Sequence, residues 1–159
     1  MNAVTPKLSV IICTHNPKPE YLQRVIGGAP GADARASEWE LLVVDNKSTR
    51  PVSESVDLSW HPHAAVSIEE QLSTTAARLH GLRRTRADVL VFVDDDNVLA
   101  PDYLERALDI ALTWPMLGSW GSAWCIQEFE TDPAPRAGAV PLLPRPGGVR
   151  KAHVVELRR

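Results

Sequence analysis

The chain has 159 residues, enough for one domain with a core, and its 44% hydrophobic and 23% charged residues are typical of a globular protein. Its formal net charge of -3 provides no basic face for phosphate backbones, which argues against a nucleic-acid partner. No apolar run approaches the ~20 residues that cross a bilayer and the first ten residues do not resemble a signal peptide, so we expect a cytoplasmic protein without a transmembrane segment.

Strand and helix patterns alternate along the chain. The first strand is predicted at 8–12, where β-branched residues follow one another without polar alternation. A helix follows within PEYLQRVIGG, where Leu22, Val25 and Ile26 share one face and two glycines end it. Two further strands are predicted at 40–44 and, more weakly, at 64–68.

The second half of the pattern repeats the first. STTAARLHGLRRT predicts a helix with Ser73 or Thr74 as its N-cap and with an apolar face of Ala76, Leu79 and Leu82. VLVFV at 89–93 predicts a strand, and a helix after Pro101 is predicted from the spacing of Leu104, Ala107, Leu108 and Ala111. This alternation predicts an α/β fold with a mainly parallel sheet, whose ligands bind at the carboxyl ends of the strands.

Polar residues follow each of the three strongest strands. Thr14 and Asn16 follow the first, Asp45 follows the second, and Asp94, Asp95 and Asp96 follow the strand at 89–93. Adjacent carboxylates repel one another, and a divalent cation such as Mg²⁺ or Mn²⁺ would remove that conflict. The alternative for DDDN alone is a solvated strand end that starts a helix.

Four segments in this order resemble the family 2 glycosyltransferases, which have the GT-A fold: LSVIICTHN, ELLVVDNKS, QLSTTAARLHGL and VLVFVDDDNVLAPDYLERAL. The resemblance implies transfer of a sugar from a nucleoside-diphosphate sugar, most often a uridine one, with inversion and with Mn²⁺ or Mg²⁺. It also implies a glycan, lipid-linked or small-molecule acceptor.

The resemblance also implies roles for individual residues. Thr14 and Asn16 would lie against the nucleotide, and Asp45 would bind the base or ribose. Arg78 matches the family's arginine near the nucleotide. Asp94 and Asp96 form the DxD motif, with Asp94 on the ribose side and Asp96 on the metal, and Asp95 is adjacent to both. Leu79 and Ser73 depart from the family's asparagine and glycine.

We expect the acceptor side of the fold to be short or missing. No Glu-Asp pair, the usual site of the catalytic base in the family, follows the aspartates. Glu128 and Glu130 are the candidates for acceptor contact. We expect a nucleotide-sugar-binding domain over 1–130 and an irregular, loosely attached tail rich in proline, glycine and arginine over 131–159.

Two other functions are compatible with parts of the pattern. One is a truncated, non-catalytic nucleotide-sugar-binding module that works with a partner chain or as a homo-oligomer. The other is a phosphorelay receiver domain, which the CTHN sequence after the first strand disfavours because a receiver has an acidic pair there. Cys13 and Cys125 lie in apolar stretches and are expected to be buried free thiols.

Overall fold

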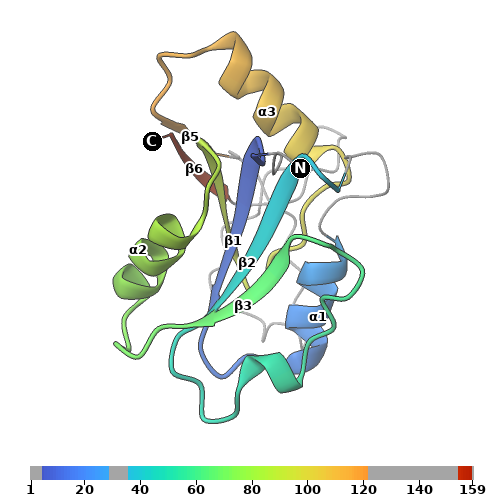
Figure 1. The fold of residues 1–159 in the computed structure, drawn as a ribbon, viewed down its shortest axis with the longest axis vertical. Helices are drawn as coiled ribbons and strands as arrows, with labels where there is room; N and C mark the ends of the chain where they lie inside the picture. The colour runs from blue at the N-terminus through green and yellow to red at the C-terminus, as the bar shows by residue number, and fades with distance from the viewer. Residues whose placement is uncertain (1–4, 29–35, 122–153, 159) are drawn as a thin grey trace, which may run out of the picture.

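The computed structural model describes residues 5–28, 36–121 and 154–158 of the chain (Figure 1). Its strands are β1 (Leu8–Thr14), β2 (Trp39–Asp45), β3 (Ala64–Ile68), β4 (Val89–Asp94), β5 (Ser119–Trp120) and β6 (Val154–Arg158). Its helices are α1 (Pro19–Gly28), the 3₁₀ turn η1 (Val52–Glu54), α2 (Thr74–Arg84) and α3 (Tyr103–Thr113).

The strands form one sheet in the order β3-β2-β1-β4-β6-β5. β3, β2, β1 and β4 are parallel neighbours, whereas β6 pairs antiparallel with both β4 and β5. The predicted mainly parallel α/β sheet is therefore confirmed, and all four predicted strands are present. Parallel pairing places the carboxyl ends of β1, β2 and β4 at one edge.

Helices cover both faces of this sheet (Figure 1). One face packs Val10 and Ile12 of β1 against α1 and α3, which contribute Leu22, Val25, Ile26, Leu104, Ala107 and Ala111. The other face packs Ile11 of β1 against Ala77 of α2. Successive residues of β1 thus bury opposite faces, which explains why its sequence is apolar without alternation.

The prediction of which face of α2 is buried is wrong in part. Ser73 caps the helix as predicted, since its hydroxyl accepts a hydrogen bond from the Ala76 N–H. The buried positions, however, are Ala77 and Gly81, and Leu79 is 43% exposed. Two small residues one turn apart bring α2 closer to the sheet than leucines would allow, so closeness of approach decides which face is buried.

The end of the chain differs from the irregular tail that the sequence predicts. Val154–Arg158 forms β6, which lies between β4 and β5 in the sheet. The segment VVELR begins with two β-branched residues, and strand propensity of this kind is expressed when a sheet edge is available for pairing. The boundary at residue 130 lies outside the described residues and stays a prediction.

Candidate functional site

The strand register brings the predicted site residues to one edge. Thr14 of β1 pairs with Asp45 of β2, and Cys13 of β1 pairs with Asp94 of β4. Residues from three strands far apart in sequence therefore meet within one or two rungs of the sheet. This is the edge at which open parallel α/β sheets bind ligands.

The three consecutive aspartates differ in environment. Asp94 and Asp96 are exposed, whereas Asp95 is partly buried and accepts a hydrogen bond from the Thr14 hydroxyl. Burial raises the pKa of Asp95, and the neighbouring charges of Asp96 and Asp94 raise it further, while the Thr14 hydrogen bond lowers it. The middle carboxylate is thus directed to β1, and the outer two remain accessible to a ligand.

Arg78 of α2 reaches the same aspartates. Its Nη2 lies 3.2 Å from Oδ1 of Asp94, and the side chains of both residues are exposed. The partly buried thiol of Cys13 lies nearby, and its pKa is raised to about 11. Burial is the main cause of the raised pKa; the charge of Arg78 opposes it, and the charges of Asp94 and Asp95 add to it. The raised pKa keeps Cys13 a protonated free thiol at neutral pH.

Asp45 shapes the loop that follows β2. Its side chain is buried, with Oδ1 accepting from the Ser48 N–H at 2.9 Å and Oδ2 accepting from the Val52 N–H at 3.0 Å. Burial alone raises the pKa of Asp45, but the hydrogen bonds from Ser48 and Val52 outweigh that effect and lower it. Asp45 is ionised in the fold and holds the loop in a fixed shape.

Asn16 joins the loops after β1 and β2. Its backbone N–H donates to the Ser48 hydroxyl at 2.9 Å, and its Oδ1 accepts from the Thr49 N–H at 2.7 Å. Both loops contain a left-handed residue, Asn16 with φ 50° and Lys47 with φ 57°. Asparagine adopts this conformation more readily than other residues with side chains, but lysine does not, so the sequence signals only the first turn.

Two polar links, one buried and one partly buried, were not predicted as part of the site. The Asn46 side chain bonds to the backbone between β3 and α2. His80 of α2 lies between β3 and the loop after it, with Nε2 2.6 Å from Ser67 Oγ and Nδ1 3.1 Å from Glu69 Oε2. A polar residue directly after an apolar strand was the only sequence signal for Asn46, and that signal does not distinguish a buried link from a ligand contact.

The exposed oxygens of Asp94 and Asp96 fit a hard divalent cation. In residues 5–28, 36–121 and 154–158, no group of three or more His, Cys, Asp or Glu side chains is arranged to hold a metal. Mg²⁺ and Mn²⁺ do not require one, because they bind through one or two carboxylates plus waters and substrate phosphates. Two exposed carboxylates of this kind are therefore compatible with a cation whose other ligands are waters and phosphate oxygens.

A separate hollow of about 730 Å³ lies at the C-terminal end of α3. Its lining includes Ile110, Trp114, Met116, Leu117 and Trp120 and no charged residue. An apolar lining cannot compensate the charge of a diphosphate, so this hollow is not the polar site. The acceptor-side candidates Glu128 and Glu130 lie outside the described residues.

The chain is similar in sequence to known glycosyltransferases. Residues 9–141 match the model of the family described as Glycosyl transferase family 2. The chain is 28% identical over 111 residues to the glycosyltransferase AglE of Haloferax volcanii, an alignment that covers 68% of this chain and 36% of AglE. No helix in the described part of the chain is both long and apolar enough to cross a membrane.

Solved structures show the same fold. S. aureus TarS, residues 1–349, superposes with a TM-score of 0.57 at 26% identity, covering 67% of this chain and 32% of that one. The mannosyltransferase PcManGT from Pyrobaculum calidifontis superposes with a TM-score of 0.59 at 23% identity, covering 78% of this chain and 36% of that one. The chain spans about a third of the length of these relatives. The family match extends over most of the sequence, and the chain belongs to glycosyl transferase family 2.

Proposed function

We propose that the chain binds a nucleoside-diphosphate sugar, UDP-linked, together with Mn²⁺ or Mg²⁺, and serves as the donor-binding part of an inverting glycosyltransferase. The proposal is carried by the meeting of Thr14, Arg78 and the three aspartates at the carboxyl edge of the sheet. Two structural relatives support the ligand class, since TarS was solved with UDP-GlcNAc and PcManGT with GDP-Man and Mn²⁺.

The residues divide the binding task between them. Asp94 and Asp96 hold the cation, which when bound stabilises the negative charge of the leaving diphosphate. Arg78 orients Asp94 and adds positive charge beside it. Thr14 and Asn16 lie on the nucleoside side, as does the buried Asp45, which holds the loop after β2 in place there.

Asp95 has a supporting role in this proposal. Because it accepts the Thr14 hydrogen bond, it fixes the end of β4 to the end of β1. The exposed carboxylates on either side of it then face the ligand from a backbone that is held in place. Such preorganisation of the groups that contact the ligand lowers the entropic cost of binding.

Titration calorimetry of the full chain with UDP, with and without Mn²⁺, tests the proposal. We expect binding that depends on the metal and that Asp96→Asn weakens about 10-fold or more, since each tenfold corresponds to about 1.4 kcal/mol. Asp88→Asn is the matched control, because Asp88 is an exposed aspartate before β4, at the opposite end of the same strand. Absence of metal-dependent nucleotide binding, or equal loss in both variants, contradicts the proposal.

The donor and the activity are tested separately. Tighter binding of GDP than of UDP would indicate that the donor is a GDP-sugar and not a UDP-sugar. Whether the chain cleaves a donor is tested by incubating it with UDP-GlcNAc or another UDP-sugar and measuring the free sugar by mass spectrometry. Metal-dependent UDP binding without any cleavage or transfer identifies a nucleotide-sugar-binding module instead of a transferase.

A further inference from the structure

Asn46 is a buried amide whose hydrogen-bonding groups are all used. Its Nδ2 donates to the carbonyl oxygens of Glu69 at 3.1 Å and Gln71 at 2.7 Å, and its Oδ1 accepts from the Ser73 N–H at 2.9 Å. The residue is 5% exposed, and its own backbone N–H donates to the Thr14 carbonyl oxygen at 2.8 Å. Both amide hydrogens are occupied, so Asn46 acts on the protein backbone and not on a ligand.

These bonds fix the point at which α2 begins. The segment 69–73 links β3 to α2, and Ser73 at its end is the N-cap of the helix. Asn46 bonds to the first, third and last residues of this segment. The start of α2 is thereby attached to the end of β2, beside the site edge.

Arg78 depends on that attachment. It lies in the second turn of α2, and its pair with Asp94 is exposed at 3.2 Å. An exposed ion pair contributes only about 0–1 kcal/mol, which is too little to pull a helix into place. The location of α2 therefore sets the location of the guanidinium, and the ion pair follows from it.

We propose that Asn46 is a positioning residue of the nucleotide site, which holds the start of α2 so that Arg78 stays beside Asp94. The inference rests on the proposed function, because the effect is expected on binding of a nucleoside diphosphate with a divalent cation. The amide is essential to the role. An aspartate at this position would keep one oxygen as the acceptor for the Ser73 N–H, but its other oxygen would face the carbonyl oxygens of Glu69 and Gln71 with no hydrogen to donate to either.

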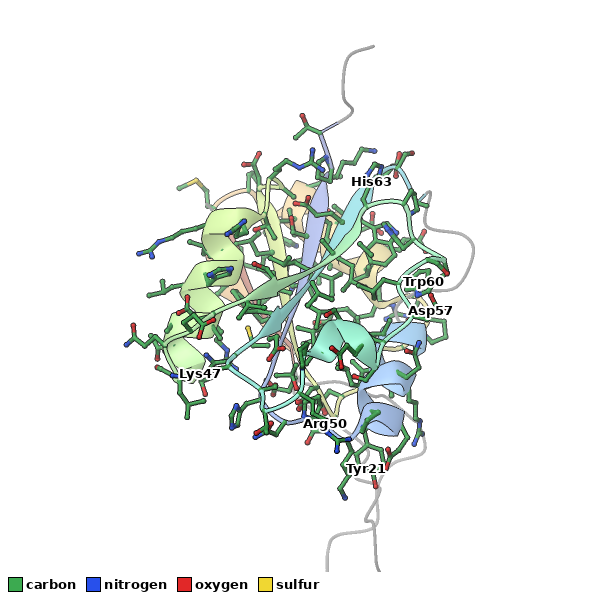
Figure 2. The ribbon with its side chains drawn as sticks, turned by 60° about the horizontal axis from the view of Figure 1, so that its bottom comes forward. Tyr21, Lys47, Arg50, Asp57, Trp60 and His63 are labelled. Carbon is green, nitrogen blue, oxygen red and sulfur yellow. The ribbon has the colours of Figure 1, made fainter. Side chains whose placement is uncertain are left out.

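The test compares Asn46→Ala and Asn46→Asp with His61→Ala. His61 is buried and lies just before β3, at the end of the sheet away from the site; Figure 2 shows the neighbouring His63 at the opposite end from Lys47, which follows Asn46. We expect all three variants to lower Tm. Only the Asn46 variants should weaken UDP binding with Mn²⁺, by about 10-fold or more, a size typical for loss of supporting hydrogen bonds around a metal site.

A second arm asks whether the effect runs through Arg78. In an Arg78→Ala background, Asn46→Ala should cause no further loss of UDP affinity, because the group that it positions is gone. An unchanged affinity in Asn46→Ala, measured well below its Tm, overturns the inference. The same is true of an equal loss with and without Arg78. Asn46→Ser, whose hydroxyl can donate one bond, replaces the alanine variant if that one does not fold.

Amide hydrogen exchange separates this inference from the proposed function. Exchange over Ser73–Arg78 should rise in Asn46→Ala and not in His61→Ala. If the wild-type chain binds no nucleotide, the proposed function fails, and the exchange arm still decides whether Asn46 fixes the start of α2. Unchanged exchange in that segment overturns the positioning role by itself.

Discussion

Replacing Gly81 by alanine tests how closely α2 approaches the sheet. A Cβ at this position would lie 2.5 Å from Cγ2 of Ile11 and 3.4 Å from Cγ2 of Val44. Both neighbours are fully buried and β-branched, so neither can move its methyl group away by changing a flexible side-chain end. The helix or the strand has to shift.

The magnitude follows from two opposing terms. Alanine is better than glycine in a helix interior by about 1 kcal/mol. Overpacking a core by one methyl group costs about 1–3 kcal/mol. The net change for Gly81→Ala is therefore a destabilisation of about 0–2 kcal/mol. Gly27→Ala isolates the favourable term, because nothing lies within 4 Å of a Cβ placed at Gly27 of α1.

Urea denaturation followed by circular dichroism measures both variants under the same conditions. We expect the free energy of unfolding to fall for Gly81→Ala and to stay level or rise for Gly27→Ala, with a difference of about 1–3 kcal/mol between them. Ile11→Leu, which removes the β-branch, should recover part of the Gly81→Ala loss. Equal effects of the two glycine substitutions would refute the close approach of α2.

Three further predictions concern buried polar groups. Burial lowers the pKa of His61, and the nearby His63 lowers it further. The neutral imidazole should therefore contribute its full stability above pH 6.5, the ordinary pKa of histidine, and this contribution should be lost as the pH falls below that value. A series of Tm measurements in which His61→Phe shows the same dependence on pH as the wild type would contradict this prediction. Glu40→Gln should cost about 1–3 kcal/mol in urea unfolding, because the buried carboxylate accepts from the Arg86 N–H at 2.6 Å. Thr14→Val should raise the pKa of Asp95 further, which ¹³C NMR of its carboxyl group would detect, and an unchanged pKa would exclude the contact.

The regular elements could be predicted because their signals are local. β1, β2 and β4 are runs of mostly apolar residues without polar alternation, and α1 and α3 bury residues that a 3.6-residue period selects. The Ser73 N-cap is likewise a local signal, since it requires only a side-chain oxygen before a helix. The shared carboxyl edge of these strands then follows from their parallel arrangement, whereas the order of the strands in the sheet was not predicted.

The remaining features depend on contacts between distant segments. Sequence spacing favoured Leu79 over Ala77 as a buried residue of α2, yet the sheet selects the small residues because they permit close packing. Lys47 adopts a left-handed conformation that its side chain does not favour, within the loop that Asp45 holds. Neither choice can be decided before the partner surface is known.

The three aspartates show how a local motif and a distant contact combine. Asp94 ends β4, and Asp95 and Asp96 lie in the turn that follows, which the Asn97 N–H closes by donating to the Asp94 carbonyl oxygen at 3.0 Å. In this turn Asp94 and Asp96 are exposed, whereas Asp95 is partly buried. Thr14 makes this possible because it supplies a donor to a carboxylate that burial would otherwise disfavour. The repulsion among the three charges is reduced in the fold by separating their directions, and the Arg78 charge beside Asp94 reduces it further. The two outer carboxylates of the motif are therefore exposed in a turn whose middle carboxylate is bound to a hydroxyl on another strand.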